Sequence, residues 1–384
     1  MKNSKVIKYC SGCGLCASNS NGGTDSRGFY RPNINTAFDS KYCYATIIDQ
    51  AVNSNSIWGP FDKIYLGYSP NDEIRYKASS GGVLTEICRW MLETHQVDGI
   101  LHIQEDKKNP LKTILKCSIS VDDLFSGMGS RYTASAPLLN IFDYLGKGKK
   151  YVFVGKPCDV RILRNYIKLN QEYCNDIILF LSFFCAGTPS VQAHESLFNA
   201  LGCRKEDVEH ISYRGKGWPG MTQVHLKSGK ILECEYETSW GKYLGRNLQE
   251  VCRFCWDSTG EAADISCGDA WFLENGKPIF NESKGRNLIF SRTDIGKRTL
   301  LEMSEANSLI IEGECKVSEL EQIQYAQLNR KATMFSKILA MRCLNKEVPN
   351  YRLSTLFKYS KKVSCKRNLK IFIGTLERIV SKNI

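Results

Sequence analysis

Cysteines are the residues of this sequence most able to do chemistry, and the 384-residue chain contains 17 of them. A chain of this length builds a hydrophobic core without disulfide staples, so this number of thiols indicates a metal or redox role. Several of them, such as Cys88 and Cys343, lie in apolar stretches, and we expect these only to fill the core. The others fall into two groups with ligand-like spacing.

The first group has the spacing CxxCxxC and consists of Cys10, Cys13 and Cys16. Gly12 and Gly14 leave the backbone free to wrap around an iron–sulfur cluster, which this spacing favours. A zinc knuckle is the alternative. The bacterial ferredoxin run continues to a fourth cysteine, but position 20 is a serine. Either Cys43 or a ligand from outside the chain would complete the site.

The second group combines a CxxC pair with two single cysteines that follow predicted strands, and its members are Cys158, Cys185, Cys252 and Cys255. Residues 151–154 and 177–184 are apolar and rich in strand formers, which predicts two buried strands. Open α/β sheets place ligands at the carboxyl ends of their strands. No histidine has zinc-finger spacing from the CxxC pair, so four thiolates for a [4Fe-4S] cluster are the better interpretation.

The elements that must position these cysteines follow from the hydrophobic pattern. Residues 83–92 have apolar positions at helical spacing, directly after a small-residue loop. Between residues 61 and 325, helical periods alternate with short apolar runs, which predicts a mixed α/β (α+β) fold with a mixed sheet. Residues 1–60 suit a small module held by a metal cluster, and residues 326–384 are predicted to be helical.

The formal net charge of +12 is unevenly distributed, because residues 351–384 hold nine Lys or Arg and one acidic residue. No helix-turn-helix or basic-aromatic platform accompanies this charge, so we expect no nucleic-acid partner. The apolar residues of 369–380 recur at helical spacing among basic ones. This suits either an interfacial helix on anionic lipid or a terminal helix docked on the body.

Neither a signal peptide nor an apolar run near the roughly 18 residues that span a bilayer is evident in the sequence. We therefore expect a cytoplasmic protein, with peripheral contact at the inner face of the membrane through the basic tail.

Seven blocks of the sequence, in this order, resemble the beta subunit of coenzyme F420-reducing hydrogenase and its dehydrogenase relatives. They are ASSGGVLTEICRWML at 78–92, GSRYTAS at 129–135, VGKPCDVRILR at 154–164, FFCAGTPS at 183–190, YRGKGWPG at 213–220, CRFCWDSTGEAADIS at 252–266 and RNLIFSRTDIG at 286–296. The resemblance implies a flavin-binding domain with one [4Fe-4S] cluster, whose ligands in this chain would be Cys158, Cys185, Cys252 and Cys255. An N-terminal ferredoxin-like module also occurs in the family, usually with complete motifs.

The same resemblance implies FAD contacts in three loops: Ser79, Ser80, Gly81 and Gly82; Gly155, Lys156 and Pro157; and Arg214 and Lys216. A helix N-terminus offers free N–H groups and a positive dipole end to a pyrophosphate, which agrees with the first two loops. The alternatives are a plain helix cap for the first loop and a solvated hairpin turn for the third.

We therefore expect an iron–sulfur flavoprotein oxidoreductase that passes electrons between one or two [4Fe-4S] clusters and FAD. Ferredoxin is the expected electron donor or acceptor, and a deazaflavin-like coenzyme or another small molecule is the expected substrate. Some family members resemble proteins of capsule or exopolysaccharide synthesis, so polysaccharide biosynthesis is one expected setting. The alternative is a zinc-stabilised interaction module without catalysis, which would not require the small-residue loop or the GKPC turn.

Overall fold

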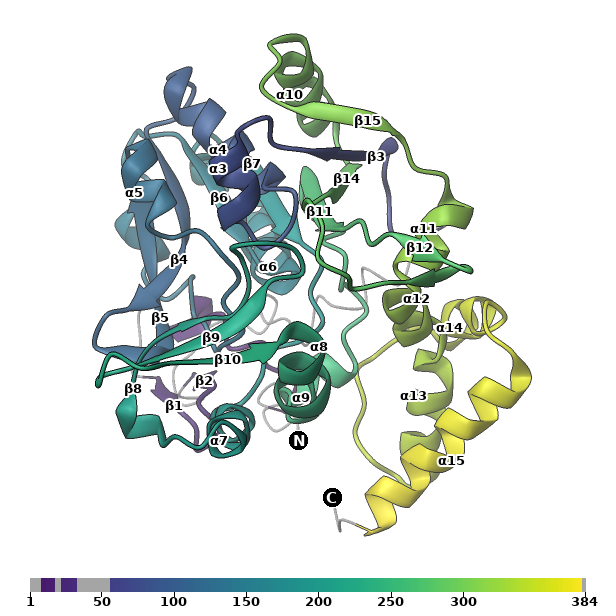
Figure 1. Ribbon diagram of the computed structural model, residues 1–384. Coiled ribbons are helices and arrows are strands. Elements are labelled where there is room, and N and C mark those ends of the chain that lie inside the picture. Colours follow the sequence, from purple (N-terminus) through teal and green to yellow (C-terminus); the bar gives the residue numbers. More distant parts are fainter. Residues whose placement is uncertain (1–7, 18–21, 33–55, 382–384) are drawn as a thin grey trace.

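The computed structural model describes residues 8–17, 22–32 and 56–381 (Figure 1). Its centre is an eight-stranded mixed sheet. In sheet order, the strands are β15 (Ile310–Glu314), β3 (Lys63–Tyr68), β14 (Asn287–Ser291), β11 (Ile265–Asp269), β7 (Ile177–Phe183), β6 (Tyr151–Gly155), β4 (Gly99–Asp106) and β5 (Asn109–Ser118).

Four neighbouring strands of this sheet, β11, β7, β6 and β4, run parallel, and the outer strands pair antiparallel. The chain leaves β6 into α6 (Pro157–Leu169) and returns as β7, which is a βαβ crossover. The carboxyl ends of β6, β7 and β11 consequently lie at one edge of the sheet. Both strands that were predicted to end near a cysteine are therefore confirmed.

Alternating side chains of the parallel strands bury both faces of the sheet. Val152 and Leu179 pack with α4 (Val83–Glu93) and α10 (Asp294–Glu305) on one face. Phe153 and Phe180 pack with α6 on the other. This two-sided burial explains why these strands are continuous apolar runs.

A second, three-stranded sheet lies in front of the large one in Figure 1 and consists of β8 (Val208–Ser212), β9 (Met221–Leu226) and β10 (Ile231–Glu235). Two short ribbons pair β1 (Gly23–Thr24) with β2 (Tyr30–Arg31) and β12 (Leu273–Glu274) with β13 (Lys277–Pro278). In the described part of the chain, the other α-helices of four or more residues are α3 (Asp72–Lys77), α5 (Val121–Phe125), α7 (Val191–Ala200), α9 (Glu250–Arg253) and α11 (Val317–Ile323), followed by the C-terminal helices.

The C-terminal helices stack beside the sheet, from yellow-green to yellow in Figure 1. They are α12 (Tyr325–Ala332), α13 (Met334–Cys343), α14 (Leu353–Ser360) and α15 (Cys365–Ser381). Helix α15 docks on α13, where Ser336 donates a hydrogen bond to Asn368 at 2.9 Å. In the described part of the chain, no helix is both long and apolar enough to cross a bilayer. The predicted mixed α/β fold with a helical C-terminal region is confirmed, whereas the boundaries at 60 and 325 stay predictions.

Candidate functional site

Two cysteines of the second group lie at the carboxyl edge of the parallel strands. Cys158 is the second residue of α6, and Cys185 follows β7 by two residues. The backbone N–H of Cys185 donates to the carbonyl of Ser258 at 2.8 Å. This bond brings the segment that follows the CxxC pair to the end of β7.

The CxxC pair lies on and just after α9. The N–H of Thr188, three residues beyond Cys185, donates to Sγ of Cys252 at 3.4 Å. The thiol of Cys255 reaches the carbonyl of Asp257, also at 3.4 Å. The bond from the N–H of Thr188 to a cysteine sulfur is of the kind found around iron–sulfur clusters, whereas in the second contact the thiol is the donor.

Electrostatic interactions link the four thiols in a chain of three pairs: Cys252 with Cys185, Cys185 with Cys158, and Cys158 with Cys255. Burial and the charge of Cys252 raise the pKa of Cys185 to about 11, and Arg330 opposes the rise. Burial, followed by Asp159, raises the pKa of Cys158, to which Cys185 and Cys255 also contribute. Residues up to 97 positions apart in the sequence thus share one neighbourhood.

None of these cysteines forms a disulfide in the described structure. Across residues 8–17, 22–32 and 56–381, no three His, Cys, Asp or Glu side chains are already placed to hold one metal ion. The donor set, four partly or fully buried thiols with backbone N–H groups aimed at two of them, nevertheless suits a [4Fe-4S] cluster. Ligation by these residues stays a prediction.

A buried ion pair lies at the start of α6, where a cofactor-contacting loop was predicted. Nζ of Lys156 lies 2.7 Å from Oδ2 of Asp159 and also donates to Ser135. Although burial alone would lower it, the pKa of Lys156 is raised by Asp159 together with Cys158 and Cys185. Lys156 therefore places a positive charge beside the thiols, while Gly155 and Pro157 shape the turn into α6.

The first cysteine group is also brought together. Burial raises the pKa of Cys13, followed by the charges of Asp159, Cys10 and Cys16. Gly12 and Gly14 have φ of +72° and +94°, so the glycines supply the left-handed conformations that the tight CxxCxxC segment needs. Cys43 lies outside the described residues.

The two cysteine groups are neighbours. The carboxylate of Asp159 raises the pKa of both Cys13 and Cys158, so it lies within electrostatic range of both groups. Hydrogen bonds to backbone carbonyls hold the first group in place: the N–H of Leu138 donates to the carbonyl of Cys13 at 2.9 Å, and Nε2 of Gln249 donates to the carbonyl of Cys10 at 2.9 Å. A shallow crevice follows this junction and is lined by Ser11, Gly12, Phe29, Tyr30, Ala134, Ser135, Thr188 and Gln249.

The predicted flavin loop, Ser79 to Gly82, opens α4, as expected. Its groups are engaged within the protein: Oγ of Ser79 accepts from the backbone N–H of Ser130 at 2.8 Å, and Oγ of Ser80 donates to the backbone carbonyl of Arg286 at 2.9 Å. The N–H of Val83, the first residue of the helix, faces Oδ1 of Asn287 at 3.3 Å. The loop side chains thus bond to other segments of the protein and not to the helix itself, and both the cofactor contact and the capping alternative stay predictions.

The third predicted loop contains one buried and one exposed residue. Arg214 is buried and forms a two-bonded pair with Asp269, at 2.9 and 3.0 Å. Its guanidinium also lies 4.7 Å from the ring centre of Tyr236. Lys216 is exposed and contacts Gln223 at 3.3 Å. Arg214 is thus committed to a carboxylate at the end of β11, whereas Lys216 can reach a ligand.

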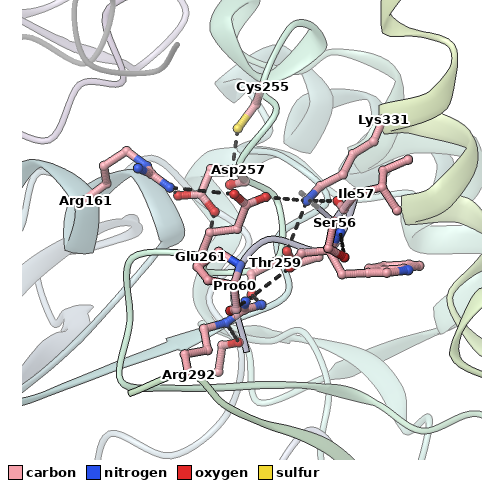
Figure 2. Close-up of polar contacts among 12 residues, drawn as sticks. Ser56, Ile57, Pro60, Arg161, Cys255, Asp257, Thr259, Glu261, Arg292 and Lys331 are labelled. Atoms are coloured by element: carbon pink, nitrogen blue, oxygen red, sulfur yellow. Dashed lines mark hydrogen bonds and ion pairs between the residues drawn. The ribbon is translucent and has the colours of Figure 1, made fainter. Parts of the chain in front are cut away.

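A buried network of charges lies next to the CxxC segment (Figure 2). Nε of Arg161 lies 2.7 Å from Asp257, and Nζ of Lys331 lies 2.7 Å from Glu261. Burial raises the pKa of Glu261, and Lys331 opposes that rise. Arg292 completes the network by donating to the carbonyls of residues 58, 60 and 259. The network joins segments that are far apart in the sequence.

Sequence reasoning missed several residues around the thiols, namely Asp159, Arg161, Asp257, Glu261, Arg330 and Lys331. Asp159, Arg161, Asp257 and Glu261 could have been found, because they lie inside two of the blocks that carry the family resemblance, VGKPCDVRILR and CRFCWDSTGEAADIS. Arg330 and Lys331 had no such sequence signal, because two adjacent basic residues on a helix usually lie on its solvent-exposed face.

The described fold is mixed α/β, and cysteines gather at the carboxyl edge of its parallel strands. Residues 64–143 match the family model "Coenzyme F420 hydrogenase/dehydrogenase, beta subunit N-term", and residues 148–316 match the model of the C terminus of the same subunit. The chain belongs to the coenzyme F420 hydrogenase/dehydrogenase beta-subunit family, as the resemblance indicated.

Individual relatives agree with this assignment. The chain is 25% identical over 299 residues to the coenzyme F420 hydrogenase subunit beta of Methanococcus voltae, covering 76% of this chain and 99% of the relative. It is also 25% identical over 237 residues to the F420-dependent formate dehydrogenase subunit beta of Methanocaldococcus jannaschii, covering 59% of this chain and 58% of that one.

The fold also matches a solved structure. A chain of the F420-reducing [NiFe] hydrogenase complex from Methanosarcina barkeri superimposes with a TM-score of 0.56 at 19% identity. The match covers 77% of this chain and 98% of that one. At this identity the likeness concerns the fold.

Proposed function

We propose that this protein is an iron–sulfur flavoprotein that transfers electrons between a [4Fe-4S] cluster and FAD. One observation carries the proposal: Cys158, Cys185, Cys252 and Cys255 come from distant positions in the sequence, and each lies within electrostatic range of at least one other near the carboxyl edge of the sheet. A flavin exchanges electrons in pairs or singly and a cluster exchanges them singly, so the two groups together link hydride and one-electron chemistry.

The protein's own contribution is to hold and charge-balance the site. The four cysteines would supply thiolates, and Lys156 and Arg330 place positive charge next to them. Backbone N–H groups of Gly187 and Thr188 donate to the sulfurs of Cys185 and Cys252. Positive charge and N–H donors both stabilise thiolates in a buried site.

We propose the first cysteine group as the entry point for electrons. Cys13 and Cys158 both lie near Asp159, so a second cluster held by the first group would be a neighbour of the main one. A small electron carrier such as ferredoxin is the partner that fits this arrangement. The relatives are named for coenzyme F420, which supports a deazaflavin-like coenzyme as the substrate at the flavin.

An absorption spectrum of anaerobically purified full-length protein tests the proposal. We expect broad visible absorption from an iron–sulfur cluster together with flavin peaks, and bleaching of both by dithionite. Iron and acid-labile sulfide analysis should show the loss of one cluster in Cys158→Ser. The matched control is Cys343→Ser, whose thiol is exposed at the end of α13. A colourless protein that contains zinc would overturn the proposal.

A further inference from the structure

Helix α12 reaches the cysteine site although it lies outside both stretches that match the family models, 64–143 and 148–316. Nε2 of Gln327 and Nη1 of Arg330 each lie 3.4 Å from the carbonyl oxygen of Cys185. Nη2 of Arg330 donates to the carbonyl of Cys252. One guanidinium thus contacts the two segments that carry a strand-end cysteine and a CxxC cysteine.

The fork of the guanidinium suits this position. The N–H donors of the guanidinium point in fixed, diverging directions, so one arginine side chain can bridge two carbonyls. A lysine ammonium would not hold both carbonyls in the same geometry. The neighbouring residue, Lys331, is almost fully buried and is anchored at Glu261, which fixes α12 against the CxxC segment. Arg330 is therefore held in place by its own helix.

We propose that Arg330 is a positioning residue of the cysteine site, which holds the Cys185 and Cys252 segments together and keeps a positive charge beside the cluster that they would bind. The inference rests on the proposed function and adds a role for a helix that the family models do not include.

Loss of Arg330 should have two separable consequences for the protein with its cluster bound. One-electron reduction adds a negative charge to the site, and a nearby cation stabilises that charge, so loss of the cation lowers the midpoint potential. Loss of the bridge between the carbonyls loosens the ligand segments, so iron dissociates faster. Arg330→Gln removes the charge and most of the bridge, whereas Arg330→Lys keeps the charge and loses the bridge.

The experiment compares full-length wild type, Arg330→Gln, Arg330→Lys and Arg367→Gln, all purified anaerobically. Arg367 is the matched control, because it donates to the neighbouring Asn329 at 3.0 Å. Potentiometric titration followed by electron paramagnetic resonance gives the midpoint potential, and transfer of iron to a chelator gives the release rate. In iron-free protein, mass spectrometry measures alkylation of Cys185 and Cys252 by iodoacetamide.

We expect a lower potential, about tenfold faster iron release and faster alkylation in Arg330→Gln. Arg330→Lys should restore the potential but not the release rate, and Arg367→Gln should match wild type. A folded Arg330→Gln protein with unchanged potential and release rate would overturn the inference while leaving the cluster intact. Absence of iron from the wild type would instead reject the proposed function, and the inference with it.

Discussion

The Nζ atom of Lys331 lies 2.7 Å from Oε1 of Glu261, and both side chains are almost completely buried. The same ammonium donates to the carbonyl of Ile57 at 2.9 Å and to Oγ1 of Thr259 at 3.2 Å. It thereby joins α12, the CxxC segment and the chain that leads into β3.

Replacing this lysine should destabilise the protein strongly. In Lys331→Met, Glu261 would stay buried with Asp257 as its acidic neighbour, and breaking one partner of a buried pair costs about 3–5 kcal/mol. Urea denaturation followed by circular dichroism measures the free energy of unfolding. The double variant Lys331→Met/Glu261→Gln should regain much of the loss.

An exposed ion pair provides the control for that experiment. Lys63 pairs with Glu314 at the sheet edge, with side chains 45% and 60% exposed. Exposed pairs contribute little, so Lys63→Met should leave the urea midpoint unchanged. Equal effects of the two lysine substitutions would contradict the role assigned to the buried network.

Iron content should separate the two cysteine groups. The thiol of Cys10 accepts from the N–H of Gly12 at 3.3 Å and lies near Cys13 and Cys16. We expect Cys10→Ala to lose the iron of one cluster and to keep the flavin and the second cluster. Iron and sulfide counting checks this. Wild-type iron in the variant would show that the first group holds no cluster.

Gly81 is constrained by protein packing. A Cβ at this position would lie 2.8 Å from Oδ1 of Asn287, 2.9 Å from its backbone nitrogen and 3.0 Å from the carbonyl of Gly67. Gly81→Val should therefore lower the melting temperature markedly, because the backbones of β14 and β3 cannot move aside without a large energetic cost. Gly313→Val is the control, since its Cβ would meet no atom within 4 Å. A Gly81→Val protein as stable as wild type, yet free of flavin, would favour a cofactor at this loop.

Lys337 should make stability depend on pH. Burial, together with Arg330, Arg378 and Arg367, lowers its pKa from 10.5 to about 7. Between pH 7 and 10.5 the unfolded chain holds a proton on this lysine that the folded protein lacks, so the contribution of Lys337 to stability rises with pH. Lys337→Met should exceed wild type in stability at pH 6, by a margin that shrinks toward pH 10.

The arginine replacement is the natural comparison. Lys337→Arg keeps its charge at every pH used, so its stability relative to Lys337→Met should not change between pH 6 and pH 10. Urea midpoints at each pH provide the measurement. A constant margin between wild type and Lys337→Met would contradict the lowered pKa.

The parts of the site that depend on local pattern could be predicted from the sequence. The apolar runs 151–154 and 177–184 predict strands with Cys158 and Cys185 at one sheet edge, because parallel strands align their carboxyl ends. The small-residue loop before α4 is likewise a local signal. Cys13 and Asp159 lie near each other although their segments are far apart in the sequence. Neither hydrophobic periodicity nor a turn motif connects these segments, so no local pattern predicts this proximity.

Residues whose contacts are with distant parts of the sequence could not be identified from local sequence patterns. Arg330 is a basic residue on a helix, and only the docking of α12 shows that it faces two cysteine carbonyls. Arg214 was predicted to contact a cofactor, yet its pairing with Asp269 depends on the end of β11 lying beside the 213–220 loop. Such pairs form through long-range packing, which the local patterns of a single sequence do not reveal.

The anchoring of Lys331 has a consequence for the order in which the native protein opens. Because its ammonium is fixed to residues 57, 259 and 261, α12 cannot separate from the body without exposing a buried carboxylate. Elements joined in this way exchange their amide hydrogens as one cooperative unit. Amides of α12 should exchange with deuterium as slowly as those of β11, whereas α15, most of whose residues retain solvent access, should exchange through earlier, smaller openings.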